Sequence, residues 1–426
     1  MAIKAVYVPW LHMHQPMVWF EGKLMGNLEK MLKEGMYDAK KMARAYTNPA
    51  IYVKKLAKYN PKVMLDFSGS LLESLEKLSL DGTLDSETVF MDREGVEDKI
   101  GNFLRLYKEA FDEYPNNIEW AGTGYHHPYF PATPKADWGA QIQLWRDRFK
   151  ELFGADALKR VKGFWLPEMG IPGEPDLYYL IEEIKKHGYK WLILPAVNNL
   201  SLVPIMPRKG EMTRFQVINE PHVLVAKNEK GEETRIIAIV REPDIDQQAG
   251  CGAQGIRDKM MWVSKEYKPK SVSAPLLVPT GDGENGNVMM NEFFPSTFDA
   301  FFREFRSKEY ESMLVSEYLE RELKERKEEY ETASFSEVEI KKEGGSWMGG
   351  HQQWLQGDRR LKVVKELHEL SEKVHLAKNK DSDKYKRAYS ALLTSETSCY
   401  VYWGSDYWFD QAEETMKLTR NLIRNL

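Results

Sequence analysis

The chain has 426 residues, of which 42% are hydrophobic and 29% charged, a balance typical of globular proteins large enough for more than one structural unit. Its formal net charge of -5, with acidic and basic residues interleaved, argues against a nucleic-acid partner, which needs a concentrated excess of Lys and Arg. The only two cysteines, Cys251 and Cys399, exclude a disulfide framework and a cysteine-based zinc site.

The beginning of the chain bears on its location. From Met1 to Trp10 the sequence enters a strand-like run without the apolar core of about 7–15 residues that marks a signal peptide. No segment approaches the roughly 20 consecutive apolar residues that span a bilayer. We therefore expect a soluble, cytoplasmic protein that does not associate with membranes.

Seven short segments rich in β-branched and aromatic residues are predicted to be buried strands. In chain order they are Ile3–Trp10, Val63–Phe67, Ile118–Ala121, Val161–Leu166, Lys190–Leu194, Arg235–Val240 and Ala274–Pro279. Most are followed by helical periodicity, in Ile51–Tyr59, Leu71–Leu78, Ile100–Tyr114, Ala140–Phe153, Pro175–His187 and Asn291–Arg306. This alternation indicates a parallel sheet covered by helices, and seven or eight such units usually close into a barrel. We therefore predict an α/β fold, a (β/α)7 barrel over residues 1–306.

Two regions depart from the alternation. Around residues 205–235, Phe215–Ile218 and His222–Lys227 are predicted to form an inserted hairpin with a turn at Asn228–Gly231. After about residue 307 the strand pattern disappears, and helices are predicted at Lys308–Thr332, Leu361–Ala377, Lys384–Leu393 and Gln411–Leu426. Residues 307–426 are therefore predicted to form a helical bundle that packs on the barrel and completes its cleft.

Unusual polar and aromatic clusters fall at the ends of the predicted strands. The first strand ends in His12-Met-His14-Gln15-Pro, the third leads to Tyr125-His126-His127-Pro, the fourth ends in Trp165-Leu-Pro-Glu168, and the seventh ends in Gly-Asp282-Gly-Glu284-Asn. Barrel enzymes assemble their active sites at the carboxyl ends of the strands, so these clusters are expected to meet.

Two carboxylates in these clusters are candidate catalysts. Glu168 follows a strand directly, and Asp282 lies between glycines that let a substrate approach the backbone closely. Taken alone, each has a simpler interpretation: Glu168 as a helix cap, and Asp282 as a turn residue. Two carboxylates about 5–5.5 Å apart across a glycosidic bond would serve as nucleophile and as acid/base. The position of both at strand ends favours this interpretation.

The histidines allow two interpretations. His12 and His14 are two residues apart at the end of a strand, so their side chains are expected to point the same way. Together with Asp66, which lies in the second strand, they would suit a metal site. Alternatively, neutral imidazoles bind sugar hydroxyls and stabilise the transition state. We favour the second use, because no further Asp, Glu or Cys is adjacent.

Two late segments are rich in glycine and aromatic residues. Gly344–Gly357 contains Trp347 and Trp354, and Ser395–Trp408 contains Glu396 and Trp403. Indole rings stack on the apolar faces of sugars, so the segments suit a carbohydrate cleft. Packing between bundle and barrel explains them equally well.

Taken together, these stretches resemble glycoside hydrolase family 57, in the order in which that family carries them. The sequence is similar to its first four motifs at His12–Pro16, Gly122–Pro128, Gly163–Glu168 and Gly281–Asn285. Gly345–Leu355 and Ser395–Gly404 resemble the Gly-Ser-Trp segment and fifth motif of its amylopullulanase-like branch. Where that branch usually has an acidic residue, this chain has Cys399.

The resemblance implies a (β/α)7 barrel with a C-terminal helical bundle, a retaining mechanism on α-glucans and no required cofactor or metal. It implies that Glu168 is the nucleophile and Asp282 the acid/base. It also places His14 and Trp10 at the bound sugar, and Trp354 and Glu396 near the cleft. The full set of predicted sugar-binding residues is Trp10, His12, His14, Gln15, Tyr125, His126, His127, Trp165, Glu284, Trp354, Glu396 and Trp403.

The leading hypothesis is therefore an enzyme that cleaves or rearranges α-1,4-linked, or α-1,6-linked, glucans such as maltooligosaccharides. Two alternatives stay open: a metal-dependent mannosidase-like or deacetylase-like barrel, and an inactive glucan-binding protein. The sequence leaves the linkage and chain-length preference, the ratio of hydrolysis to transfer and the oligomeric state undetermined.

Overall fold

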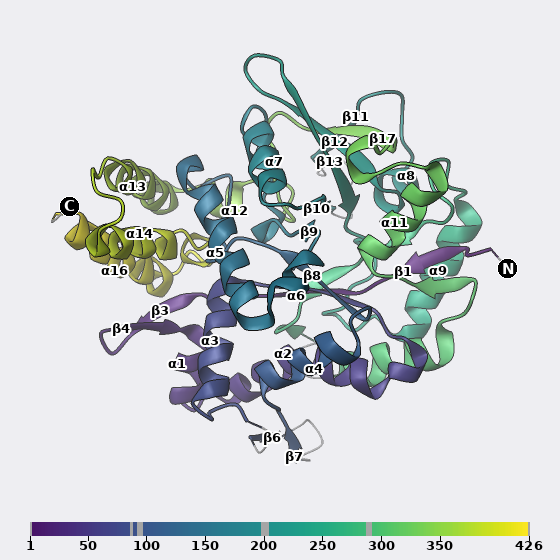
Figure 1. Cartoon of the computed structure of the whole chain (residues 1–426), viewed down its shortest axis with the longest axis horizontal. Coiled ribbons are helices and arrows are strands. Elements are labelled where there is room, and N and C mark those ends of the chain that lie inside the picture. Colours follow the sequence, from purple (N-terminus) through teal and green to yellow (C-terminus); the bar gives the residue numbers. More distant parts are fainter. Residues whose placement is uncertain (1, 86–87, 92–96, 197–203, 287–291, 425–426) are drawn as a thin grey trace.

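The computed structural model describes residues 2–85, 88–91, 97–196, 204–286 and 292–424. Parallel strands form a barrel at the centre, helices cover it, and the C-terminal helices lie together at one side (Figure 1). Each of the seven strands predicted from the sequence is confirmed by a strand at that position. Within the described residues, no helix combines the length and apolarity needed to cross a membrane.

The barrel strands follow one another in chain order. They are β1 (Ala5–Tyr7) with β2 (Trp10–Met13), β5 (Val63–Phe67), β8 (Ile118–Gly122), β9 (Gly163–Phe164), β10 (Trp191–Leu194), β13 (Glu233–Val240), and β14 (Leu276–Leu277) with β15 (Thr280–Asp282). Neighbouring strands from β15 through β2 to β13 pair in parallel. Pro9 interrupts the first strand and Pro279 the last, because proline has no N–H for the ladder. A bond from Glu242 N to Val278 O (2.9 Å) links the last two strands.

Alternate residues of the strands enter two different cores. Leu11 and Leu65 pack outward against the covering helices, whereas Trp10, Met64 and Trp191 form a second cluster with helix α11 (Val315–Arg326). The period of two along each strand produces this division. Burial on both faces explains why these strands read as continuous apolar runs in the sequence.

The covering helices follow the barrel strands. They are α1 (Asn27–Lys33), α2 (Tyr37–Lys55), α3 (Gly69–Leu80), α4 (Phe103–Glu113), α5 (Lys135–Phe153), α6 (Ala155–Lys159), α7 (Asp176–Lys186), α9 (Ala253–Glu266) and the π-helical turns η4 (Phe293–Phe298) and η5 (Phe301–Phe305). In α3, Ser68 caps the first turn by accepting a bond from Leu71 N (3.3 Å), and Leu71, Leu75 and Leu78 are buried in the helix–barrel core. The expected β/α alternation is thus present.

The predicted hairpin is only half right. Its second strand, β12 (His222–Lys227), pairs antiparallel with β13, so the hairpin leads directly into a barrel strand. Its expected first strand at 215–218 is instead the helix α8 (Arg214–Asn219). Thr213 caps α8 by accepting from Gln216 N (3.2 Å), and this local cap outweighs the β-propensity of the Phe-Gln-Val-Ile run.

The expectation that strands end near residue 307 was wrong. β16 (Tyr310–Ser312) pairs in parallel with β1, and β17 (Ser336–Ile340) pairs with β12 and with β11 (Ile205–Pro207). Val338 and Ile340 alternate with Glu337 and Glu339, which is the period of a half-buried strand. Residues 310–340 therefore extend the sheets of the barrel.

The last helices form a bundle of their own, as predicted. They are α12 (Gln352–Leu355), α13 (Asp358–His375), α14 (Asp383–Ser395), α15 (Cys399–Tyr402) and α16 (Asp406–Ile423). Leu370, Leu392 and Ala412 belong to its core, which also takes in Tyr129 from the barrel side. Figure 1 shows α13, α14 and α16 packed together, with α16 next to the hairpin β3 (Met17–Phe20)–β4 (Lys23–Gly26). The remaining short elements are η1 (Ala57–Tyr59), β6 (Val89–Met91), β7 (Glu97–Lys99), η2 (Pro167–Met169) and η6 (Tyr330–Thr332).

Candidate active site

A cleft opens where the barrel strands end and the bundle begins. Its main cavity has a volume of about 530 Å³, and a smaller one of about 100 Å³ adjoins it. Both cavities are lined by His12, Glu168, Gln248, Asp282 and Trp347. The main cavity is also lined by His14, Gln15, His127 and Glu284 from the barrel side and by Cys399, Tyr402, Trp403 and Trp408 from the bundle side. The strand ends therefore meet in one place.

Glu168 lies at the end of β9 in the single turn η2. Its backbone has φ 57°, ψ 17°, in the left-handed region that side chains other than glycine rarely adopt. Such a conformation persists only where the surroundings fix it, and it is common at functional sites. Trp347 Nε1 donates to Glu168 Oε2 (2.9 Å), and Ser398 Oγ donates to Oε1 (2.8 Å). Each carboxylate oxygen is thus held by a residue of the C-terminal region.

The electrostatic environment of Glu168 contains opposing influences. Burial, helped by the charge of Asp282, raises the pKa of Glu168 above its ordinary value, while the bonds from Trp347 and Ser398 and the charge of His12 offset part of this rise. A nucleophilic carboxylate has to be ionised, so the two donors and the cation act in favour of the reactive form. Glu168 and Asp282 both line the same cavities, and the charge of Asp282 acts on the pKa of Glu168.

Asp282 ends β15 and Glu284 follows it in the next turn. Gly283 N donates to His12 O (2.7 Å), which ties this turn to the neighbouring strand β2. His14 N donates to Glu284 Oε1 (3.1 Å), whereas Glu284 Oε2 is buried without a partner among the described residues. Burial and the negative charge of Asp282 raise the pKa of Glu284 to about 8. At neutral pH Glu284 therefore carries a proton that it can donate to a ligand hydroxyl.

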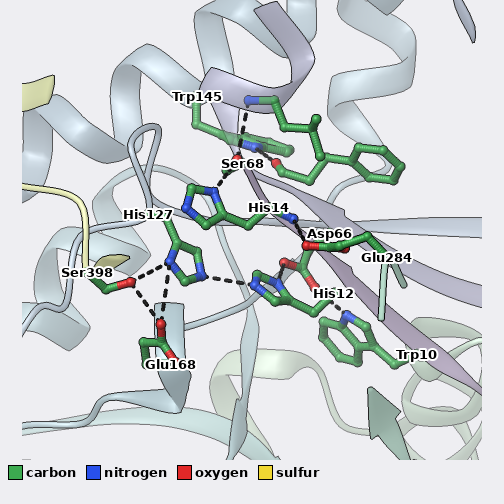
Figure 2. Close-up of polar contacts among 12 residues, drawn as sticks. Trp10, His12, His14, Asp66, Ser68, His127, Trp145, Glu168, Glu284 and Ser398 are labelled. Carbon is green, nitrogen blue, oxygen red and sulfur yellow. Dashed lines mark hydrogen bonds and ion pairs between the residues drawn. The ribbon is translucent and has the colours of Figure 1, made fainter. Parts of the chain in front are cut away.

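Strand register places His12 between two acids. Its partner on β5 is Asp66, and its partner on β15 is Asp282. His12 Nδ1 contacts Asp66 Oδ2 at 2.5 Å, and Trp10 Nε1 donates to Asp66 Oδ1 (2.7 Å), as Figure 2 shows. Burial alone lowers the pKa of His12, but the charge and hydrogen bond of Asp66 outweigh it and raise the pKa to about 9. His12 is therefore an imidazolium at neutral pH.

The rings of His14 and His127 stack face to face with their centres 4.0 Å apart, and His127 also contacts His12 (Figure 2). His14 Nδ1 contacts Ser68 Oγ at 2.7 Å, while its Nε2 is buried without a partner in the part of the chain that the structure describes. Burial, together with the charge of His12, lowers the pKa of His14 well below its ordinary value. A neutral ring with one free nitrogen at the cavity wall suits a sugar hydroxyl.

Seven of the predicted sugar-binding residues line the cleft: His12, His14, Gln15, His127, Trp165, Glu284 and Trp403. Trp165 forms a wall of the smaller cavity and stacks on His12 at 4.8 Å. Trp403, 57% exposed, lies at the rim of the larger one. Glu168 and Asp282 join them, so the structure gathers the four strand-end clusters into one site.

The other five predicted residues lie outside this lining, among the described residues. Trp10 is fully buried behind Trp165 and holds Asp66. Trp354 is also fully buried and stacks on Tyr129 at 4.3 Å within the bundle core. Their indole rings have no exposed face for a sugar. They support the site from behind.

Tyr125, His126 and Glu396 are turned into neighbouring elements. Tyr125 donates to Glu73 (2.7 Å), and His126 N donates to Gln141 Oε1 (2.9 Å). Glu396 accepts from Gln141 Nε2 (2.8 Å) between bundle and barrel, and burial raises its pKa well above the ordinary value. These three residues join the bundle and α5 to the barrel and do not reach the cleft lining.

Several residues that line the cleft or contact Glu168 were not assigned to the site from the sequence. Arg241 and Gln248 follow the sixth barrel strand, and the rule that sites form at strand ends would have found them. Trp347 and Ser398 lie in the two late segments, which are rich in aromatic residues and resemble the Gly-Ser-Trp segment and the fifth motif, but neither residue was given a role. Nothing in the local pattern marks Ser398, whose importance depends on its contact with Glu168.

The residues proposed for a metal site are engaged with one another. Both ring nitrogens of His12 are used, in contacts with Asp66 and with His127 Nε2 (2.9 Å). In the described part of the chain, no three His, Cys, Asp or Glu side chains are grouped as metal ligands would be. Binding of a metal by His12 would therefore cost both of its hydrogen bonds.

A comparison with family models decides the family. The model described as glycosyl hydrolase family 57 matches residues 9–225, just over half of the chain. The chain belongs to glycosyl hydrolase family 57. This confirms the resemblance seen in the sequence. A search of curated proteins finds no match.

Solved structures support the fold at low sequence identity. A 4-α-glucanotransferase from Thermococcus litoralis matches with a TM-score of 0.63 and 16% identity, over 100% of this chain and 60% of its own length. A branching enzyme of the family from Pyrococcus horikoshii matches with 0.63 and 16%, over 98% and 88%. An α-amylase from Thermotoga maritima matches with 0.59 and 15%, over 100% and 93%. This member of family 57 therefore has the barrel and helical region of these enzymes and spans 60% of the length of the glucanotransferase.

Proposed function

We propose that the chain is a retaining glycoside hydrolase or glucanotransferase that acts on α-1,4-linked or α-1,6-linked glucans by double displacement. The observation that carries the proposal is the placement of Glu168 and Asp282 on one cavity, near enough for their charges to interact. Membership of family 57 and the resemblance of both motifs support it. The enzymatic activities of the structural neighbours point to the same class of substrate.

In the first step, an oxygen of Glu168 attacks the anomeric carbon and the glycosidic C–O bond breaks. Asp282 gives its proton to the departing oxygen, and a glycosyl ester forms on Glu168. In the second step, Asp282 takes a proton from water or from an acceptor hydroxyl, which attacks the anomeric carbon and releases Glu168. Two inversions retain the anomeric configuration.

The walls of the cleft suit a sugar chain. Trp165, Tyr402 and Trp403 supply aromatic surface, and Glu284 and His14 each offer a polar atom that has no hydrogen-bond partner among the residues the structure describes. Sugars need both, because their ring faces are apolar and their edges carry hydroxyls. The charge of His12 and the stacked neutral His127 lie beside the nucleophile, where positive charge favours the ionised carboxylate.

The proposal is tested by incubating the protein with maltooligosaccharides, amylose and pullulan and analysing the products and their anomeric form. A fluorinated glucosyl fluoride should leave a covalent adduct, which peptide mass spectrometry should locate on Glu168. Products of inverted configuration, or an adduct on another residue, would refute the assignment.

The same experiments separate the alternatives. A metal-dependent enzyme would lose activity on exhaustive chelation and regain it with added metal, whereas the double-displacement enzyme would keep it. An inactive glucan-binding protein would bind maltooligosaccharides without turnover or adduct. A cytoplasmic location stays a prediction from the sequence.

A further inference from the structure

A continuous chain of short hydrogen bonds leads from a buried acid to the nucleophile. It runs from Asp66 to His12 (2.5 Å), from His12 Nε2 to His127 Nε2 (2.9 Å), and from His127 Nδ1 to Ser398 Oγ (2.8 Å). Ser398 Oγ then donates to Glu168 Oε1 (2.8 Å). Figure 2 shows the side chains following one another in this order. The chain connects β5, β2, the loop after β8, the bundle and the turn that carries Glu168.

The proton on each of these groups can be placed by starting at the contact between Ser398 and Glu168 and working back to Asp66. The single proton of Ser398 goes to Glu168, so Ser398 Oγ has to accept the proton on His127 Nδ1. Burial and the neighbouring His14 and His12 lower the pKa of His127 well below its ordinary value, so its ring is neutral and Nε2 bears no proton. Nε2 therefore accepts from His12 Nε2, and His12 Nδ1 donates to Asp66. One arrangement of protons satisfies every contact.

His12 is the only charged link between the two acids at the ends of the chain. The acidic groups that face it are Asp66 on β5, Asp282 on β15 and Glu284 in the following turn, and His14 and His127 are the other titratable groups at its ring. Glu168 faces Asp282, His12 and, at 3.9 Å, His127 Nδ1, besides its donors Trp347 and Ser398. The imidazolium of His12 is thus the counter-charge nearest to the nucleophile along the chain.

Main-chain bonds hold His127 and Ser398 in position, independently of the hydrogen bonds between their side chains. His127 has φ 58°, so both ends of the His127–Ser398–Glu168 section use left-handed residues. Ser398 N donates to His127 O (2.9 Å), and Pro128 and Thr397 form an antiparallel bridge. Because these bonds use main-chain atoms, Ser398 keeps its position when its hydroxyl group is removed.

We propose that Asp66, His12, His127 and Ser398 form a hydrogen-bonded chain that orients the Glu168 carboxylate and keeps it ionised, with Ser398 as the positioning residue that makes the final contact. This inference rests on the proposed role of Glu168 as nucleophile. It assigns to the bundle a part in tuning the reactive group of the barrel. It also gives His12 a role as a fixed cation, in addition to its place in the cleft wall.

The first test compares Ser398→Ala with Ser395→Ala, a matched control. Ser395 lies in the same segment, is buried, and donates only to a backbone carbonyl, Ala391 O (2.9 Å). Loss of the donor should lower kcat/KM on a maltooligosaccharide about 10- to 100-fold, mainly through kcat. The acid limb of the pH profile should move up by about one unit, because Glu168 loses a bond that favours its ionised form. Equal effects in both variants, or an unmoved acid limb in Ser398→Ala, would overturn the proposal.

Asp66→Asn tests the far end of the chain. It keeps the shape of the side chain but removes the charge that holds His12 protonated, so the acid limb should move in the same direction. With both substitutions present, the shift should be smaller than the sum of the single shifts, because one connected chain is broken twice. Full additivity would show that the two residues act separately.

Nuclear magnetic resonance tests the proposed positions of the protons without requiring the protein to turn over a substrate. In protein labelled with ¹⁵N-histidine at pH 7, His12 should carry protons on both nitrogens and His127 on Nδ1 alone, with signals assigned through His12→Gln and His127→Gln. In ¹³C-glutamate-labelled protein, the midpoint of the Glu168 carboxyl titration should rise by about one unit in Ser398→Ala. A neutral His12, a His127 protonated on Nε2, or an unchanged midpoint would overturn the chain. Absence of glucan turnover with these signals as expected would reject only the proposed function.

Discussion

The barrel and the C-terminal region contribute different kinds of groups to the cleft. The strand ends supply groups that carry charge or titrate, among them His12, Glu168, Asp282 and Glu284. The C-terminal region supplies neutral donors and aromatic surface, through Trp347, Ser398 and Trp403.

The contacts of Glu168 connect the two regions. The matched family model covers residues 9–225, which include Glu168 and the histidines but neither Trp347 nor Ser398. Yet both oxygens of Glu168 are held by those two later residues. In the proposed mechanism the barrel provides the reacting groups, and the donors Trp347 and Ser398 of the later region orient the Glu168 carboxylate.

The largest effects are expected from the barrel carboxylates. Glu168→Gln should lower kcat by about 10⁴-fold or more, and Asp282→Asn by about 10²- to 10⁴-fold, because they remove the nucleophile and the general acid. Steady-state kinetics on maltooligosaccharides, with melting temperatures as a check on folding, measure this. Near-normal turnover in either folded variant would remove that residue from the mechanism.

A smaller effect on the same carboxylate is expected from the C-terminal side. Trp347→Phe keeps a ring at the cleft but removes the donor to Glu168 Oε2, so kcat/KM should fall about 10- to 100-fold. The acid limb of its pH profile should also move upward, since Glu168 is then less readily ionised. Trp262→Phe, at an exposed surface tryptophan, is the control. Similar kinetics for both variants would deny Trp347 a part in holding the nucleophile.

Two tryptophans separate packing from substrate contact. Trp354→Ala removes a fully buried ring and should lower the free energy of unfolding by about 3–5 kcal/mol. Trp403→Ala removes a ring that is 57% exposed, so stability should change by less than about 0.5 kcal/mol while KM rises roughly 2- to 10-fold. Denaturant unfolding and kinetics, measured side by side, check the pair. The opposite pattern would place Trp354 at the substrate and Trp403 in the core.

A final expected effect concerns the dependence of stability on pH. The pKa of Glu284 is raised from 4.5 to about 8, so between these pH values the folded state holds a proton that the unfolded chain has released. Stability therefore falls as the pH rises from about 4.5 to about 8, and the loss is complete above 8. Glu284→Gln cannot titrate. The free energy of unfolding of Glu284→Gln, relative to that of the wild type, should therefore increase by about 1 kcal/mol for each pH unit between about pH 5 and 8. This value includes a reduction for screening by water in the cleft.

Denaturant unfolding at several pH values measures this gain. Glu372→Gln, at an exposed glutamate of α13, should show no such trend. A difference between Glu284→Gln and wild type that stays constant with pH would contradict a protonated Glu284 in the folded protein.

Much of this protein follows from its sequence alone. Runs such as Val63–Leu65 and Trp191–Leu194 are apolar throughout because they are buried on both faces, so the barrel strands could be recognised locally. The catalytic candidates were readable because strand ends share one face of a barrel, a rule that needs no distances. The helices of the bundle showed their 3.6-residue period directly.

The neighbours of each side chain follow from the way whole elements pack against one another. Tyr125, His126, Trp354 and Glu396 stand in the motifs that predicted the site, yet packing turns them into the core and the bundle interface. Ser398 shows no pattern in the sequence and gains its position from main-chain bonds to His127, 271 residues earlier. Periodicity reports burial, but long-range contacts depend on how whole elements dock, and a local sequence pattern does not encode that.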